Sequence, residues 1–457
     1  MQKTNIIFIL ADDMGYGDFG LFSEGNTITP ALDQMVAEGV CLTQCYAAAP
    51  VCVPSRAGIL TGRYHHRTGA IDMRELRGLS SIALSETTIA DVFKQNGYVT
   101  GLMGKWHNGT IGKEYHPCAR GFDEFVGFRG GMSRYYDWRL YYNWEMRESD
   151  GRHLTDVITD ESIDFITRHK DEPFYLNISY NAPHSPFEAP EEDVKIFADR
   201  GKYNDLVSTL YALILGMDRG IAKIFKTLKD LELDQNTLVV FTSDNGPQFG
   251  EKLSDDLMRY NCNLTGEKSQ VFEGGIRVPG VVRWPGKLKH RINEDCFVHG
   301  TDWFPTLLAA AGIDVPPHLK LDGQNVLPQL LGDEEHAHPK RFWQWNRYAP
   351  EITCNIAMRD GNWKLVRPPI KEAMAINRDD WNTDRIVERN PEAYTEFDKS
   401  PFPLRELPPP VPPLLFDLSN DPCEKTDLAA QHPQRVSQML TELEAWFNEV
   451  EAERQAL

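Results

Sequence analysis

A chain of 457 residues is too long for one compact core, and its 41% hydrophobic and 25% charged residues are typical of a globular protein. The formal net charge of −19 argues against non-specific binding to nucleic acid or to anionic membranes. An anionic ligand would therefore have to be attracted by a local cluster of positive side chains.

The cysteines and the first residues do not settle the compartment. Eight cysteines without a CxxC spacing are too few for a disulfide scaffold, although one or two disulfides stay compatible with them. The apolar run 6–10 is too short for a signal-peptide core or a membrane span. We therefore expect no transmembrane segment, and either a cytoplasmic protein or one whose secretion signal has been removed.

Strands and helices alternate along the first 335 residues. The run 6–10 is typical of a buried parallel strand, and Thr29-Pro30 begins a helix over 31–38. Further strands are expected at 98–104, 174–179, 238–242 and 278–283, with helices over 85–96 and 204–230. This alternation predicts an α/β domain over 1–335, with a large mixed, mainly parallel sheet between helices.

The pattern changes in the last third of the chain. Short strand candidates follow one another at 342–346, 355–358, 363–366 and 414–418, and a helix over 433–453 has one apolar face. They predict a smaller C-terminal subdomain over 336–457, with an antiparallel sheet and one covering helix. The charged and proline-rich segment 368–413 interrupts it and is expected to form a long irregular insertion.

Two polar pairs directly follow strands of the predicted sheet. Asp12-Asp13 follows the first strand, and Asp244-Asn245 follows the strand at 238–242. Ligands of open α/β sheets lie at the carboxyl ends of strands, so we expect these side chains to converge. Three carboxylates and an amide oxygen suit Ca²⁺ or Mg²⁺ and not zinc. The alternative for each pair alone is a solvated turn.

Cations and imidazoles occur near other strand ends. Lys105 and His107 close the strand at 98–104, and in an extended chain they point to the same face, as an anion site with an acid–base group requires. His184 lies between two prolines after another strand and is a candidate proton donor. Lys268 precedes the turn at 273–275. For each of these residues considered alone, the alternative is a lysine exposed to solvent or a histidine that only hydrogen-bonds to its neighbours.

The run Cys52-Val53-Pro54-Ser55-Arg56 predicts a reactive cysteine. Pro54 is typical of a helix start, which places Cys52 at a positive helix N-terminus beside Arg56. Such surroundings lower the pKa of a thiol. The alternative is a buried and inert cysteine.

The run 52–63 resembles, at every defining position, the type I sulfatase signature C-x-P-S-R-x-x-x-L-T-G-R. Further segments similar to the family are 12–13, 104–107, 182–184, 244–246, 268–275 and 415–422, so the resemblance covers nearly the whole chain except 129–150 and 368–413. One departure is the run 264–267 before Lys268, where relatives often carry an Arg-Gly pair. The resemblance implies an alkaline-phosphatase-like fold and hydrolysis of sulfate monoesters.

The resemblance also implies a metal and a modified residue. In this family the cysteine is oxidised to formylglycine by a formylglycine-generating or an anaerobic sulfatase-maturating enzyme. Cys52 therefore matches the nucleophile, which as a gem-diol attacks sulfur and also touches the metal. Asp12, Asp13, Asp244 and Asn245 match the Ca²⁺ ligands, with Mg²⁺ as the alternative.

The remaining matches are groups around the sulfate. Arg56 and Lys105 match residues that hold the diol and sulfate oxygens, and His107 matches the base that removes the second diol proton. His184 and Lys268 match groups around the bridging oxygen, with His184 as the expected acid. A gem-diol sulfate can eliminate, whereas a serine sulfate would need attack by water. These cations would also supply the local positive cluster that a chain of negative net charge needs.

The substrate is expected from segments outside the resemblance. The segment 128–142 combines aromatic rings with arginines, a mixture that suits stacking on sugars and binding of further anionic groups. Its candidate substrate-binding residues are Arg129, Arg134, Tyr136, Trp138 and Arg139. With 368–413 able to wall the pocket, we expect a sulfated saccharide, derived from a polysaccharide or glycosaminoglycan, in preference to a small aryl sulfate. The alternative for 128–142 is a packed aromatic surface loop.

Two other functions stay open on the sequence alone. A phosphate or phosphonate monoester hydrolase of the same superfamily could use the same metal and nucleophile. A non-catalytic protein that binds sulfated glycans would keep the fold without acquiring formylglycine. Turnover of matched sulfate and phosphate esters, and the intact mass of the chain, distinguish these functions.

Overall fold

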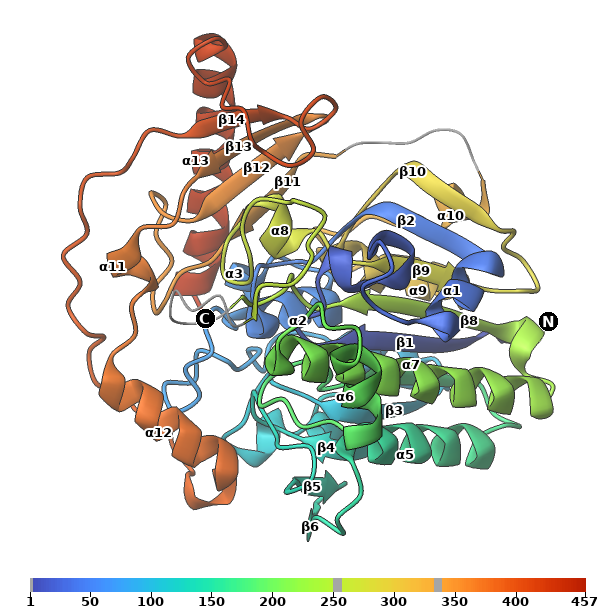
Figure 1. Cartoon of the computed structure of the whole chain (residues 1–457). Coiled ribbons are helices and arrows are strands. Elements are labelled where there is room, and N and C mark those ends of the chain that lie inside the picture. Colours follow the sequence, from blue (N-terminus) through green and yellow to red (C-terminus); the bar gives the residue numbers. More distant parts are fainter. Residues whose placement is uncertain (1–2, 250–256, 333–338) are drawn as a thin grey trace.

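The computed structural model describes residues 3–249, 257–332 and 339–457 (Figure 1). Its larger sheet has ten strands in the order β10-β2-β9-β8-β1-β7-β3-β4-β5-β6. The strands are β1 (Asn5–Ala11), β2 (Gly39–Tyr46), β3 (Val99–Lys105), β4 (Glu124–Phe128), β5 (Arg139–Tyr142), β6 (Glu145–Glu148), β7 (Phe174–Ser179), β8 (Thr237–Ser243), β9 (Gly280–Arg283) and β10 (Arg291–His299). The run β8-β1-β7-β3-β4 is parallel throughout, and β9, β5 and β6 pair antiparallel. The mixed, mainly parallel sheet predicted from the sequence is confirmed.

Helices cover both faces of this sheet because its central strand is apolar on both sides. In β1, Ile7 and Ile9 pack with residues of α1 (Pro30–Ala37), α5 (Leu154–Arg168) and α7 (Asp205–Asp230). Ile6, Phe8 and Leu10 face α2 (Cys52–Thr61), α4 (Ile89–Gln95), α9 (Trp303–Ala310) and α10 (Leu327–Leu331). Side chains alternate along a strand, so this one segment anchors both helical layers.

A smaller antiparallel sheet follows, as expected. Its strands are β11 (Arg341–Gln344), β12 (Ile356–Asp360), β13 (Trp363–Arg367) and β14 (Leu414–Asp417), paired in that order. The long helix α13 (Pro433–Gln455) lies along it in Figure 1, and Leu443 and Phe447 share an apolar cluster with Met358 and Leu365. The predicted domain boundary at 335/336 lies outside the described residues and stays a prediction.

The insertion 368–413 is not irregular throughout, contrary to expectation. It contains the short helix α11 (Lys371–Met374) and the twelve-residue helix α12 (Arg378–Arg389). The Asn377 side chain caps α12 by accepting from the Asp379 N–H at 2.7 Å. The helix is mostly polar, so no apolar periodicity announces it in the sequence.

Two expectations concern the whole chain. Across the described residues, no helix combines the length and the apolar character that a bilayer span needs. All eight cysteines fall within the described segments, and all are free thiols.

Candidate active site

The predicted site residues converge at one edge of the larger sheet. β1, β3, β7 and β8 are neighbours that run in parallel, so their carboxyl ends lie side by side. Asp12 and Asp13 follow β1, Asp244 follows β8, and Lys105 is the last residue of β3. This is the edge at which an open α/β sheet places its ligands.

The four predicted metal ligands form a buried cradle of oxygen atoms. Asp13 has a positive φ of 65°, which turns the chain so that its N–H donates to Asp244 Oδ1 at 3.2 Å. The Asn245 amide donates to Asp13 Oδ1 at 2.8 Å. The second oxygen of Asp12 accepts from Lys105 Nζ at 2.7 Å. All four side chains are at most 5% exposed, because they lie beneath the loops that follow the strands.

Two oxygens of this cradle lack a hydrogen-bond partner, although Arg56 lies 3.7 Å from one of them, Asp12 Oδ1, and they test whether a cation fits. Asp12 Oδ1 and Asn245 Oδ1 are buried and have no hydrogen-bond partner within the described residues. A buried acceptor without a partner is costly, and a cation would satisfy both at once. Carboxylate and amide oxygens suit a hard cation such as Ca²⁺ or Mg²⁺. The residues present therefore fit the predicted metal.

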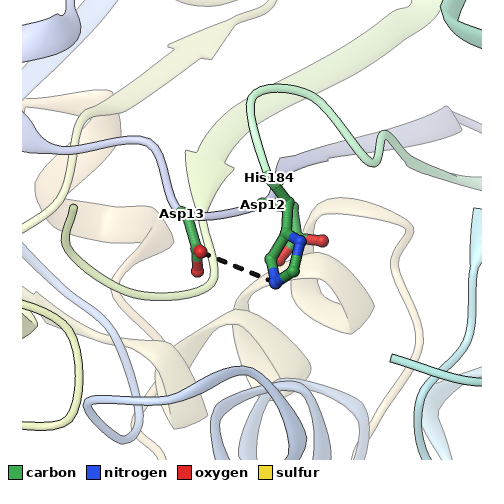
Figure 2. A group of neighbouring side chains, drawn as sticks. All are labelled: Asp12, Asp13 and His184. Atoms are coloured by element: carbon green, nitrogen blue, oxygen red, sulfur yellow. Dashed lines mark ion pairs between the residues drawn. The ribbon is translucent and has the colours of Figure 1, made fainter. Parts of the chain in front are cut away.

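His184 lies against the same cradle. Figure 2 shows its imidazole directed toward Asp13, with Nε2 3.6 Å from Asp13 Oδ2, and Asp12 close by. The Nδ1 atom lies 2.6 Å from the Ser185 carbonyl oxygen, to which it donates. Burial lowers the pKa of His184 to about 3, against the opposing effect of the Asp13 carboxylate. The ring is therefore oriented by its own turn and presents Nε2 to the carboxylates.

The signature segment forms α2, with Cys52 as its first residue. The helix begins two residues before Pro54, and Cys52 is only 1% exposed. Burial alone would raise the pKa of the Cys52 thiol, but Lys105 and His107 more than offset it, so the pKa is lowered. This direction agrees with the reactive cysteine predicted from the sequence.

Other signature residues build the helix and hold it in place. Ser55 Oγ accepts from the Ala48 N–H at 3.2 Å, and Gly62 ends the helix with a φ of 67°, a conformation that other residues rarely adopt. Arg56 Nε donates to Asp244 Oδ2 at 2.8 Å, so the second turn of α2 is tied to the metal cradle. The motif thus places Cys52, a guanidinium and the carboxylates in one cluster.

His107 does not continue β3 as an extended chain, contrary to the expectation from the sequence. Its φ of 57° lies in the left-handed region, so residues 105–107 are not a continuous extended segment. Its Nε2 lies 3.1 Å from Glu75 Oε1, and Glu75 Oε2 accepts from Ser80 Oγ at 2.6 Å. Burial lowers the pKa of His107, but Cys52 and Glu75 raise it to about 9. Glu75 is a site residue that no sequence pattern indicated.

Lys268 completes the cluster. Its Nζ lies 2.7 Å from Asp13 Oδ2, and its backbone N–H donates to the Pro247 carbonyl. Asp13 and Cys52 raise the pKa of Lys268 in spite of its burial. A charged ammonium group therefore lies beside the carboxylates, although the loop before it departs from the pattern of the family.

A cavity of about 250 Å³ opens onto this cluster. Four of the predicted residues line it: Cys52, His107, His184 and Lys268. Its other side is formed by residues that the sequence did not indicate, several of them on α12: Met73, Arg74, Met132, Arg347, Trp381, Asp384, Arg385 and Glu388. The insertion 368–413 therefore walls the pocket, as expected.

The five predicted substrate-binding residues lie elsewhere. None of them lines the cavity within the described part of the chain. Arg129 and Trp138 are buried and donate to backbone carbonyl groups. Arg134 and Arg139 pair with glutamates at the surface, and Tyr136 is 40% exposed. Their role in substrate binding stays a prediction without support from the cavity.

Comparison with known proteins agrees with this geometry. A family profile described as Sulfatase matches residues 4–313, and one described as N-sulphoglucosamine sulphohydrolase, C-terminal, matches residues 266–381. N-acetylgalactosamine-6-sulfatase of Homo sapiens is 30% identical over 96% of this chain and 84% of its own length. Steryl-sulfatase of Rattus norvegicus is 28% identical over 96% and 88%.

A solved structure is similar over almost the same extent. Ps i-CgsB, in complex with k-i-k-neocarrahexaose, has a TM-score of 0.81 and 29% identity, over 97% of this chain and 93% of that one. The sulfatase profile alone spans more than half of the chain. The chain therefore belongs to the sulfatase family, hydrolases of the alkaline phosphatase superfamily.

Proposed function

We propose that the protein hydrolyses sulfate monoesters of sulfated saccharides, using formylglycine made from Cys52 together with Ca²⁺. One observation carries this proposal: Cys52 lies at a helix N-terminus among Lys105, His107 and Lys268, beside oxygens that lack a partner. This cluster is the local positive site that an anionic substrate requires on a chain of net charge −19. Oxidation of Cys52 requires a formylglycine-generating or anaerobic sulfatase-maturating enzyme in the host.

The residues of the cradle have distinct tasks in this proposal. Asp12, Asp13, Asp244 and Asn245 would hold Ca²⁺, which when bound supplies positive charge beside the sulfate oxygens. Arg56 joins the cradle to α2 and so fixes residue 52 relative to it. Lys105 Nζ lies 2.7 Å from Asp12 Oδ2 and would add a positive charge beside the sulfate oxygens. Charges held in place before the reaction stabilise the transition state without reorganisation.

Proton transfer is assigned to the two histidines. The modification supplies, when present, a geminal diol in place of the thiol. The Cys52 thiolate that raises the pKa of His107 is then absent, so the ring can accept a proton from the diol while Glu75 holds it. His184 Nε2 and Lys268 Nζ lie beside Asp13, and Lys268, which stays charged, donates to the oxygen that leaves sulfur. His184 acts as the acid once the anionic sulfate beside it favours a proton on Nε2. A diol oxygen would form the new bond to sulfur as the bond from sulfur to the saccharide oxygen breaks, and the saccharide would leave with the proton on that oxygen. Transfer of the second diol proton to His107 would then release sulfate and restore the aldehyde.

The names of the relatives support a saccharide as substrate. N-acetylgalactosamine-6-sulfatase is named for a sulfated amino sugar, and Ps i-CgsB was solved with an oligosaccharide, k-i-k-neocarrahexaose. Steryl-sulfatase, at 28% identity, is named for a different alcohol. A cavity walled by a polar helix with one indole suits a sugar better than a sterol, because sugars need many hydrogen-bond partners.

The test combines mass, turnover and metal dependence. Intact mass should show conversion of the Cys52 thiol to an aldehyde in a host with a maturation enzyme, and Cys52→Ala should release no sulfate. Cys52→Ser should be equally inactive wherever the host does not oxidise serine. Chelation of Ca²⁺ should lower both turnover and the melting temperature, because a ligand bound to the folded state stabilises it. A converted protein that cleaves phosphate esters faster than matched sulfate esters would contradict the proposal.

A further inference from the structure

We propose that α12, together with Arg74, forms the binding site for the sugar ring that carries the sulfate, and that this ring is uncharged and rich in hydroxyl groups. The inference rests on the proposed function and names the groups that select its substrate. Trp381 would pack against the ring, and the Arg74–Asp384 pair would bind its hydroxyl groups.

One face of α12 is directed into the cavity. Trp381, Asp384, Arg385 and Glu388 all line it, and their spacing of three, four and seven residues places them on one side of a helix. Cys52 lines the same cavity. A substrate whose sulfate lies at Cys52 therefore places its sugar ring against this face.

The helix is fixed to the larger domain, so the wall has a defined position. The Leu76 N–H donates to Asp384 Oδ1 at 3.1 Å, and the Gly131 N–H donates to Glu388 Oε1 at 3.1 Å. Arg77 Nε donates to Asp380 Oδ1 at 3.0 Å. A wall held in place before binding loses little freedom when a ligand arrives.

The Arg74–Asp384 pair has unused hydrogen-bonding capacity. Arg74 is 3% exposed and Asp384 is 6% exposed, and both line the cavity. Arg74 Nη1 lies 2.7 Å from Asp384 Oδ2, yet neither atom has an aligned hydrogen bond within the described residues, nor does Arg74 Nε. A hydroxyl group can donate to the carboxylate and accept from the guanidinium, so two hydroxyls of one sugar ring would satisfy both groups.

The charges of this wall balance, which disfavours a further anionic group on the ring. Three cations and three carboxylates lie in or directly behind it: Arg74, Arg347, Arg385, Asp72, Asp384 and Glu388. The surplus cations, Lys105 and Lys268, lie at the cradle instead. Arg385 lines the wall without an ion pair among the described residues, but Asp384 and Glu388 line the same wall, so a ring carboxylate would add a third negative charge beside a single unpaired cation.

Trp381 adds the apolar surface that a sugar ring needs. Its indole is partly exposed in the cavity, and the Arg385 guanidinium lies 4.6 Å from the centre of the ring. Sugars present C–H groups as well as hydroxyls, so an aromatic face beside a polar pair is complementary to them.

The experiment compares substrates that differ in hydroxyl groups and in charge. The probes are N-acetylgalactosamine 6-sulfate, iduronate 2-sulfate, and 4-nitrophenyl sulfate, whose leaving group has no hydroxyls. Asp384→Asn keeps the acceptor for the Leu76 N–H, so the variant should fold. We expect the ratio of kcat/KM for the amino-sugar sulfate to that for the aryl sulfate to fall about tenfold or more. Asn382→Ala, an exposed position on α12 outside the cavity, should leave this ratio unchanged.

A binding measurement keeps the inference testable without turnover. In a Cys52→Ala background, Asp384→Asn and Trp381→Ala should each weaken binding of N-acetylgalactosamine 6-sulfate about tenfold. Equal losses on the amino-sugar and aryl sulfates, unchanged binding, or a preference for iduronate 2-sulfate would overturn the inference. Absence of sulfate release from every probe by converted protein would instead reject the proposed function, and the binding result would still decide the role of α12.

Discussion

Replacing Glu75 by glutamine tests a carboxylate that contacts the predicted base and not the substrate. Glu75 is 1% exposed, with one oxygen 3.1 Å from His107 Nε2 and the other 2.6 Å from Ser80 Oγ. Glutamine has nearly the same shape and can keep the contact with Ser80. The variant loses the negative charge that holds the His107 imidazole. Its amide group presents N–H donors at the place where the carboxylate oxygen accepted from the ring.

The expected loss follows from the kind of contact that is removed. A hydrogen bond to a buried charged group contributes about 1.5–3 kcal/mol. If this contact orients His107 for proton transfer, kcat should fall about 10- to 150-fold, since each 1.36 kcal/mol corresponds to about a factor of ten. KM should change little, because Glu75 does not line the cavity within the described residues.

The assay measures kcat and KM on 4-nitrophenyl sulfate with protein whose conversion of Cys52 is verified by intact mass. Glu114→Gln, an exposed position, is the matched control and should behave as the wild type. A normal kcat in Glu75→Gln, or a loss confined to KM, would refute the positioning role. Reduced conversion of Cys52 with normal activity of the converted fraction would do so as well.

Two further predictions concern stability. Lys364 is fully buried between Glu273 and Glu424, and its Nζ lies 2.9 Å from an oxygen of each. Lys364→Met leaves these carboxylates without their cation and should lower the free energy of unfolding, measured in urea, by about 3–5 kcal/mol. A loss below about 1 kcal/mol would contradict this prediction. Burial raises the pKa of Asp384 to about 7, so the folded protein keeps a proton that the unfolded chain releases near pH 4. As the pH rises from about 4 to 7, the free energy of unfolding of the wild type should therefore fall relative to that of Asp384→Asn by about 1.4 kcal/mol per pH unit. If urea unfolding of the two proteins shows the same dependence on pH, the raised pKa of Asp384 is ruled out.

Much of the fold follows from local patterns. The buried runs at 6–10 and 174–179 and the amphipathic run at 204–230 match β1, β7 and α7 closely. Apolar periodicity is a local property, so it can be recognised within a window of a few residues. The polar helix α12 has no such pattern, and its caps and partners become visible only in the structure.

The convergence of the four predicted metal ligands could also be predicted, for a topological reason. Asp12-Asp13 and Asp244-Asn245 are far apart in the sequence, but each follows a parallel strand, and parallel neighbours bring their carboxyl ends to one edge. The five candidate substrate-binding residues of the segment 128–142 do not line the cavity within the described residues, and aromatic rings and arginines pack equally well against a sugar or against their own chain. In the structure, Arg139 donates to the Arg389 carbonyl at the end of α12.

The sequence by itself determined the reaction class, because the run from Cys52 to Arg63 and the residues that follow four strands carry that chemistry at recognisable places. The tertiary structure alone decided which residues line the cavity and which residue contacts His107. Asp384 accepts a hydrogen bond from the Leu76 N–H, which lies 308 positions away in the chain. Glu75, which contacts His107, belongs to a charged segment that matches no motif. Such contacts leave no local pattern, since they depend on how the insertion folds back over the sheet edge.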